Sequence, residues 1–163
     1  MNNIIGNVID TTWPMVLVSI AIIVSLRVTY LIKNREHFIL YQELLKLASI
    51  VYVLILFQVV TNQDVVSWST NNFIPFREIF RYTLGSRLFL KNVVGNVLLF
   101  LPYGFFASYY LKEESPKLIL FLTLIGSCVI EIVQMSIGRV FDVDDILLNT
   151  IGGLSGFYVY YII

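Results

Sequence analysis

Five runs of mostly apolar residues, separated by short polar segments, dominate the chain. A helix needs about 20 mostly apolar residues to cross a bilayer, and each run approaches that length. The second run is the shortest, so its helix is expected to start upstream of Leu44. The pattern predicts an all-α fold, an integral membrane bundle of about five transmembrane helices in a single domain over residues 1–163. The runs cover residues 13–32, 44–60, 93–111, 118–137 and 146–163.

The longest segment between two apolar runs, residues 61–90, interleaves aromatic and basic residues. Its aromatic residues include Trp68, Phe76 and Phe80, and Arg77 and Arg81 lie among them. Side chains of these two kinds gather at membrane–water interfaces. The segment therefore predicts one amphipathic helix, over residues 76–82, that lies in the plane of the lipid headgroups.

The third apolar run carries polar residues that a simple lipid anchor does not need. Asn92 and Asn96 are one helical turn apart, and therefore on one face of the predicted helix. Amide groups in hydrocarbon require partners, so this face is expected to lie against other helices or a wet cavity. Pro102 removes a backbone hydrogen bond and predicts a break or kink in this helix.

The fourth apolar run is interrupted by Glu131 and, one turn later, Gln134. A bare carboxylate at mid-membrane costs roughly 3 kcal/mol, so Glu131 must be protonated, paired or solvated. Its candidate partners are Arg139, Arg87 and Lys91. An ion pair or polar clamp that holds helices in register is as good an interpretation as a functional one, because polar groups often join membrane helices. Glu131 is also the candidate general base.

The fifth run places Asp145, Asn149, Gly152 and Gly156 in one stripe of a helix. Two glycines four residues apart permit close helix contact, which is the expected role of this pair. Asp142, Asp144 and Asp145 have the oxygen ligands that divalent cations use. We favour helix capping, by Asp144 or Asp145, and an ion pair over metal binding.

Composition supports a membrane protein and excludes several other classes. Hydrophobic residues make up 58% of the chain and charged residues 13%, with a mean hydropathy of +0.81. The net charge is zero, so nothing favours a nucleic-acid partner. The single Cys128 excludes an internal disulfide, and no motif for a metal, a phosphate or another cofactor is present.

The distribution of basic residues predicts the orientation of the chain in the membrane. The loops over residues 33–46 and 112–117 are short and basic, which favours the cytoplasm. The first 12 residues contain no Lys or Arg, which argues against a cleaved leader peptide and for an extracellular N-terminus. With five spans, segments 61–90 and 138–145 then lie together on the outer side.

The order of these motifs resembles the VanZ family. The matching patterns are N-x-x-x-N-x-x-x-F-x-P-x-G over residues 92–104, then E-x-x-Q from Glu131, and R-x-x-D-x-x-D-x-x-x-N-x-x-G-G from Arg139. Asn72-Phe-Ile-Pro-Phe76 is similar to the N-x-x-P-F element of the family. The resemblance covers about residues 72–163, and it rests on the order and spacing of motifs that are loose one by one.

The resemblance implies a multi-pass protein of the bacterial cell membrane that lowers susceptibility to lipoglycopeptides such as teicoplanin. Such a protein would bind the drug, a lipid-linked cell-wall precursor or another envelope lipid. The resemblance implies no known reaction. An intramembrane enzyme or transporter for a polyprenyl-phosphate-type lipid is one alternative. An assembly partner of cell-wall enzymes, with the glycine stripe as its interface, is another, and an oligomer is left open. The expected ligand-binding residues are Arg87, Lys91, Asn92, Asn96, Glu131, Gln134, Arg139, Asp142, Asp145 and Asn149.

Overall fold

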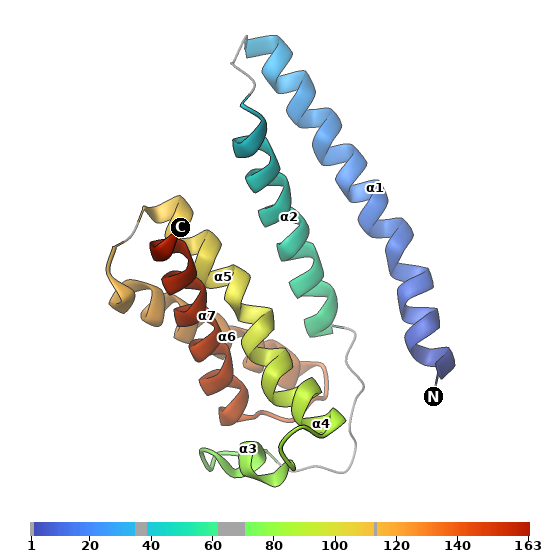
Figure 1. Cartoon of the computed structure of the whole chain (residues 1–163). Coiled ribbons are helices and arrows are strands. Elements are labelled where there is room, and N and C mark those ends of the chain that lie inside the picture. The colour runs from blue at the N-terminus through green and yellow to red at the C-terminus, as the bar shows by residue number, and fades with distance from the viewer. Residues whose placement is uncertain (1, 35–38, 62–70, 113) are drawn as a thin grey trace. The chain divides into compact units, whose positions relative to one another are not determined.

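The computed structural model describes residues 2–34, 39–61, 71–112 and 114–163. These residues form helices, with one isolated β-bridge between Asn72 and Asp142, so the predicted all-α fold is confirmed. The chain divides into two compact units, Met1–Asn62 and Gln63–Ile163, which we describe separately (Figure 1). The single domain over the whole chain stays a prediction, and Trp68 lies outside the described residues.

The first unit is a pair of helices, α1 (Asn2–Asn34) and α2 (Leu40–Thr61). Two stretches, Leu17–Asn34 and Leu40–Thr61, are long and apolar enough to cross a membrane, and they correspond to the first two predicted runs. Helix α1 begins well before residue 13, and α2 begins upstream of Leu44, as its short apolar run led us to expect.

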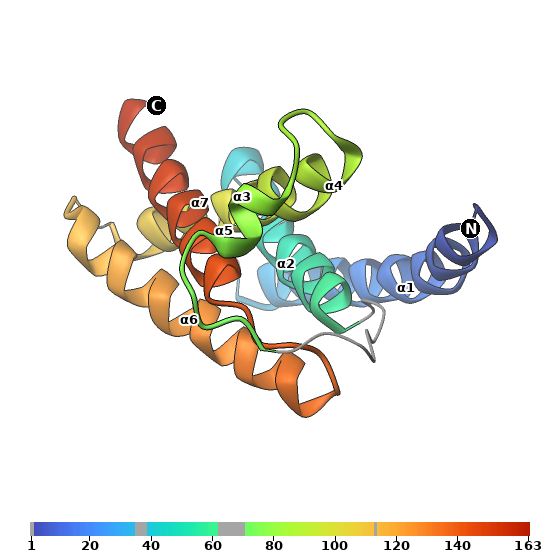
Figure 2. The ribbon, with the colours of Figure 1, turned by 90° about the horizontal axis from the view of Figure 1, so that it is seen from below.

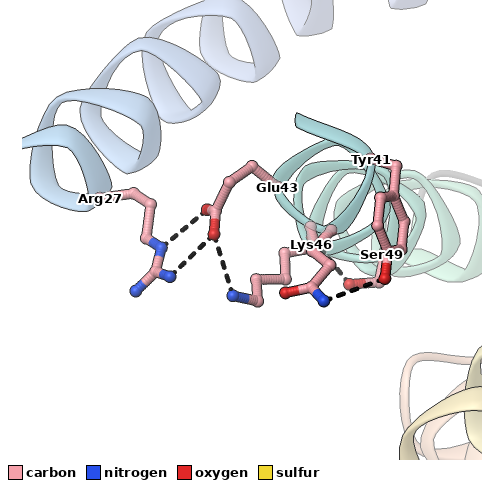
Figure 3. A network of polar contacts seen from close by, with 6 residues as sticks. Arg27, Tyr41, Glu43, Lys46 and Ser49 are labelled. Carbon is pink, nitrogen blue, oxygen red and sulfur yellow. Dashed lines mark hydrogen bonds and ion pairs between the residues drawn. The ribbon is translucent and has the colours of Figure 1, made fainter. Parts of the chain in front are cut away.

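Polar contacts join the second half of α1 to the first turns of α2 (Figure 3). Arg27 donates from Nε and Nη2 to the two carboxylate oxygens of Glu43, at 2.8 Å each. Lys46 donates to the same carboxylate at 3.0 Å, and the Arg27 guanidinium lies 5.1 Å from the centre of the Tyr30 ring. The bidentate geometry fixes the orientation of Arg27 against α2.

The second unit contains two short helices and three long ones. Helices α3 (Arg77–Arg81) and α4 (Arg87–Phe89) come first, and a π-helical segment, η1 (Leu90–Val94), leads into α5 (Gly95–Leu111). Ser115 begins α6 (Pro116–Ser136) by accepting a hydrogen bond from the Lys117 N–H, with proline at the first helical position. Helix α7 (Val143–Ile162) ends the unit, and α3 lies beside its start (Figures 1 and 2).

The structure has four candidate spans among its described residues, where the sequence predicted about five. Arg87–Leu111 and Pro116–Ser136 supply two of them, in addition to the two in the first unit. Helix α7 is 20 residues long but is not apolar enough to be the fifth. Its buried polar and glycine positions lower its hydropathy, because this helix packs against α5 and α6 instead of relying on lipid.

The third apolar run is not broken at Pro102. Helix α5 continues through this proline to Leu111, and the irregular turn lies upstream, in η1. A proline removes only its own backbone donor, and neighbouring helices can compensate for that loss in a membrane protein. The predicted break at Pro102 is therefore wrong.

Helices α5 and α7 approach so closely that their backbones touch. A Cβ atom added at Gly156 would lie 1.9 Å from the Leu101 carbonyl oxygen, and one at Gly152 would lie 2.3 Å from that of Val97. A Cβ atom at Gly104 on α5 would meet the backbone of Gly153. The glycine stripe of the fifth run is therefore the packing surface that its spacing predicted.

Candidate functional site

The described part of segment 61–90 and the loop between α6 and α7 lie at the same end of the second unit. The Asn72 N–H donates to the Phe141 carbonyl at 2.8 Å, and the Val143 N–H donates to the Asn72 carbonyl at 3.1 Å. The Asn72 side chain donates to Asp142 Oδ1 at 2.8 Å. The two segments therefore lie side by side, while the prediction that both are on the outer side of the membrane stays a prediction.

Asp142 caps helix α7. Its Oδ1 accepts a hydrogen bond from the Asp144 N–H at 2.9 Å, and α7 begins at Val143. The prediction that Asp144 or Asp145 is the cap is wrong, because the cap precedes the first helical residue and both of these lie inside the helix. Burial raises the pKa of the Asp142 carboxyl, and the hydrogen bonds from Asn72 and Asp144 offset only part of that rise.

Asp144 holds α3 against the start of α7. Only 1% of this residue is exposed, and its carboxylate accepts hydrogen bonds from the N–H groups of Phe76, Glu78 at 2.7 Å and Ile79 at 3.2 Å. Phe76 has a left-handed backbone, with φ 68°, which is unfavourable for a bulky residue. The Asp144 carboxylate thus satisfies the free N–H groups at the beginning of α3 and holds this backbone in place.

Glu131 is buried in α6, with 1% of its surface exposed. Its Oε2 accepts a hydrogen bond from the Asp142 N–H at 3.0 Å, so its partner is a backbone group of the next loop. Arg139 interacts with this carboxylate electrostatically, while Arg87 and Lys91 are exposed. Of the three predicted cationic partners, the structure supports only Arg139, and it acts at longer range than a hydrogen bond.

Asp145 joins α7 to α5. Its Oδ1 accepts a hydrogen bond from the Asn96 side chain, and its carboxylate interacts electrostatically with Glu131, Asp142 and Arg139. Three acidic side chains and one guanidinium therefore lie close enough together to influence one another. Charge changes at any one of them will alter the other three.

Asn92 has a different partner from Asn96. Its side chain hydrogen-bonds the hydroxyl of Tyr82, whose pKa is raised by burial, and it lies inside the π-helical segment η1. The prediction of one shared face assumed α-helical spacing through residues 92–96. The wider π turn changes that spacing, so the two amides serve separate contacts.

Asn149 extends the polar contacts deeper between α6 and α7. Its Nδ2 donates to Ser127 Oγ at 2.8 Å, and both residues are buried. Its Oδ1 is buried and has no hydrogen-bond partner in the described part of the chain, and the same holds for Nη1 of Arg139. Gln134 is also buried, and its backbone carbonyl accepts a hydrogen bond from the Arg139 backbone N–H at 2.9 Å. One buried acceptor and one buried donor thus remain unsatisfied at this site.

We call this group of residues the acid–amide cluster. It contains five side chains joined by hydrogen bonds or electrostatic interactions at the start of α7, together with the Asn149–Ser127 pair and the neighbouring Gln134. Its aspartate oxygens bind amides and backbone N–H groups, and no group of three metal-ligating side chains is found among the described residues. The five joined residues are Asn96, Glu131, Arg139, Asp142 and Asp145.

Sequence reasoning missed three side chains of this region. Ser127 and Tyr82 were not singled out, although Ser127 lies one helical turn before Glu131 and therefore shares its buried face. Asn72 was noted only as part of a motif, and its partners lie some 70 positions away. No local pattern indicates such a long-range pair.

The four apolar candidate spans, and a polar cluster enclosed where three helices meet, define a multi-helix membrane protein. A family model described as VanZ/LLP1 matches residues 44–163. The chain belongs to this family. The match begins inside α2, upstream of the motifs on which the sequence resemblance rests. Neither the curated proteins nor the solved structures give a match.

Proposed function

We propose that this membrane protein lowers bacterial susceptibility to lipoglycopeptides such as teicoplanin by binding the drug, or an envelope lipid that the drug recognises, at the acid–amide cluster. Membership of the VanZ/LLP1 family supports the direction of the effect. The N-terminus lies outside the cell in this proposal, which brings the cluster to the face that meets the drug.

One observation carries the choice of site. Arg139 Nη1 and Asn149 Oδ1 are both buried without a hydrogen-bond partner among the residues that the structure describes. Such groups are costly to leave unsatisfied, by about 1–3 kcal/mol each. A polar ligand that accepts from Arg139 and donates to Asn149 would satisfy both. Phosphates and carboxylates suit a guanidinium, and amide or hydroxyl groups suit an asparagine oxygen.

Discrimination between drugs follows from the location of the cluster. Teicoplanin carries an acyl chain and vancomycin does not. Each buried methylene contributes roughly 0.8 kcal/mol to membrane binding, so the acylated drug is concentrated in the layer that contains these helices. The protein is therefore expected to protect against teicoplanin more than against vancomycin.

The test is expression in a susceptible Gram-positive host, with both drugs titrated against growth. The natural chain should raise the inhibitory concentration of teicoplanin more than that of vancomycin. Two variants, Arg139→Ala alone and Arg139→Ala combined with Glu131→Ala, should each abolish this protection while the protein stays equally abundant in the membrane. Lys117→Ala is the matched control, because Lys117 is an exposed basic residue at the other end of α6. Equal protection against both drugs, or protection that survives both cluster variants, contradicts the proposal.

A second candidate function is proton-linked chemistry or transport of a polyprenyl-phosphate-type lipid. It is favoured by one observation, the burial of Glu131 beside the further carboxyl groups of Asp142 and Asp145. Glu131→Gln separates it from simple binding, because glutamine keeps the shape and acceptor of the side chain but cannot exchange a proton. In this case Glu131→Gln would stop lipid turnover in proteoliposomes, whereas a binding role would tolerate it better than Glu131→Ala.

A further inference from the structure

Residues 73–91, which precede α5, carry a surface of exposed aromatic, aliphatic and basic side chains, which we call the aromatic–basic surface. Several of its apolar side chains are largely exposed, with 82% for both Phe80 and Leu84. Basic side chains stand among them, and Arg81 is 70% exposed. The surface consists of Phe73, Ile74, Phe76, Arg77, Phe80, Arg81, Leu84, Arg87, Leu88 and Lys91.

We propose that this surface docks onto the anionic phospholipid headgroups of the leaflet that borders it. The proposal goes beyond the function above, because it concerns residues outside the acid–amide cluster and a different ligand. The exposed rings and leucines would enter the headgroup and acyl boundary. The guanidinium and ammonium groups would contact phosphates, which they match as hydrogen-bond donors and as charges.

The position of the segment in the chain argues for lipid as the occupant. The candidate span Arg87–Leu111 begins at Arg87, so α3 is only a few residues from a helix that can enter the bilayer. Exposed apolar patches with charged neighbours mark either partner proteins or membranes. A segment held this close to a bilayer boundary meets lipid headgroups before it meets any other partner.

Charge complementarity argues for anionic lipid in particular. Residues 71–91 contain four basic side chains and one acidic side chain, Glu78, which gives a net charge of +3 in a chain whose overall charge is zero. Glu78 is already paired with Arg81 at 3.1 Å. Basic groups near an anionic membrane surface are attracted within a Debye length of it, so the excess positive charge favours anionic headgroups over zwitterionic ones.

The surface is also held in a fixed orientation. The buried carboxylate of Asp144 accepts hydrogen bonds from three backbone N–H groups at the start of α3, and the Phe73 ring stacks on that of Phe141 at 5.3 Å. Phe76 keeps an exposed ring on a left-handed backbone that glycine or asparagine would adopt more easily. A surface fixed in this way loses little conformational entropy when lipid binds.

The experiment uses the full chain, with Trp13 and Trp68 replaced by phenylalanine, reconstituted into vesicles. Phe80→Trp places one fluorophore on the surface, and Leu98→Trp places it on an exposed position of α5 within a candidate span. Vesicles contain phosphatidylcholine and phosphatidylglycerol, with brominated acyl chains on one of the two lipids at a time. Bromine quenches tryptophan on contact, so the ratio of the two quenching signals reports which lipid surrounds each position.

Tryptophan at position 80 should be quenched more by brominated phosphatidylglycerol than by brominated phosphatidylcholine, and the difference should shrink in high salt. Arg77→Gln combined with Arg81→Gln should reduce this preference at least about fivefold, from the usual attraction of one basic group to an anionic surface. Tryptophan at position 98 should show no preference between the lipids. These two arginines lie outside the acid–amide cluster. The double variant should therefore keep its protection against teicoplanin, so a failure of the lipid proposal can be told apart from a failure of the proposed function.

Three outcomes would overturn the proposal. Absence of quenching at position 80 by either lipid places the surface in water. Equal quenching by both lipids removes the role of headgroup charge. Quenching that weakens as the protein-to-lipid ratio rises, with position 98 unchanged, shows that a second copy covers the surface.

Discussion

The α1–α2 pair and the α5–α7 group are both made of long apolar helices, but they are held together by different means. Of the described side chains in α1 and α2, only Leu31 and Val60 are buried, and the Arg27–Glu43 ion pair links the two helices. In the second unit, α7 alone has nine buried residues, and the glycines at its centre touch the backbone of α5.

The comparison teaches that hydropathy does not predict packing in a membrane protein. An apolar helix surface is as stable against lipid acyl chains as against another helix, so apolar residues alone give little reason to associate. Close backbone contact and buried hydrogen bonds supply that reason. Helix α7, the one long helix of the described residues without a candidate span, is accordingly the most buried.

The largest effect should come from the backbone contact between α5 and α7. Gly156→Ala introduces a Cβ atom 1.9 Å from the Leu101 carbonyl oxygen, which forces the helices apart and should cost about 3 kcal/mol, the upper end of the usual cost of overpacking. Gly126→Ala on α6 is the matched control, since its Cβ atom would lie 3.6 Å from the Tyr103 hydroxyl, an ordinary contact. Thermal unfolding in detergent measures both. Equal stability of the two variants would show that α5 and α7 are not tightly packed.

A smaller effect should come from the buried carboxylate. Glu131→Ala leaves the Asp142 N–H without its acceptor, which should lower the free energy of unfolding by about 1–3 kcal/mol. Glu131→Gln retains an acceptor oxygen and should lose less. Denaturant titration in mixed micelles measures the two variants. A loss for glutamine as large as that for alanine would show that charge, and not the hydrogen bond, stabilises this region.

The start of α7 should make stability depend on pH. The pKa of Asp142 is raised by burial above its ordinary 3.8, so the folded protein holds this proton more tightly than the unfolded chain. As pH rises past 3.8, the unfolded chain ionises first, and the contribution to stability is lost until the folded carboxyl ionises as well. Asp142→Asn keeps the cap and cannot ionise, so the melting-temperature difference between it and the natural chain should change with pH over that window. A difference independent of pH would contradict the raised pKa.

The smallest effect should come from the α1–α2 ion pair. Glu43→Gln removes the charge that Arg27 and Lys46 share, on partly exposed side chains. Such pairs contribute little and are screened by salt. Stability should fall less than in Glu131→Ala, and the loss should diminish in high salt. A larger, salt-independent loss would remove the distinction between the two units.

Much of the fold was predictable from sequence, because the length and hydropathy of an apolar run are enough to identify a membrane-spanning helix. The first four predicted runs all correspond to candidate spans of the structure, and the spacing of Gly152 and Gly156 predicted the close contact that the structure shows. The fifth run forms a helix of the expected length, α7, but it is less apolar than the four candidate spans. Its asparagine and glycines, which were noted as functional and packing features, are also what reduces its hydropathy.

The candidate site was predictable only in part of its membership, since Arg87, Lys91 and Asn92 do not join the acid–amide cluster. Polar residues within or next to apolar runs are easily recognised in the sequence. Five of those that were predicted do lie together, namely Asn96, Glu131, Arg139, Asp142 and Asp145. Their partners were not predictable, because Glu131 binds a backbone N–H that only the folded loop brings near.

Cysteine labelling will test the predicted outer side, with accessibility at position 142 and the N-terminus expected on the same face.

The π-helical segment Leu90–Val94 has a consequence for comparing members of this family. A π turn is equivalent to one residue inserted into an α-helix. A homologue with one residue fewer here would have a regular helix, and its counterpart of Asn92 would turn away from the Tyr82 contact and toward the face that Asn96 presents to Asp145. The number of residues in this segment would then decide whether one asparagine side chain or two lie near the counterpart of Asp145 in a family member.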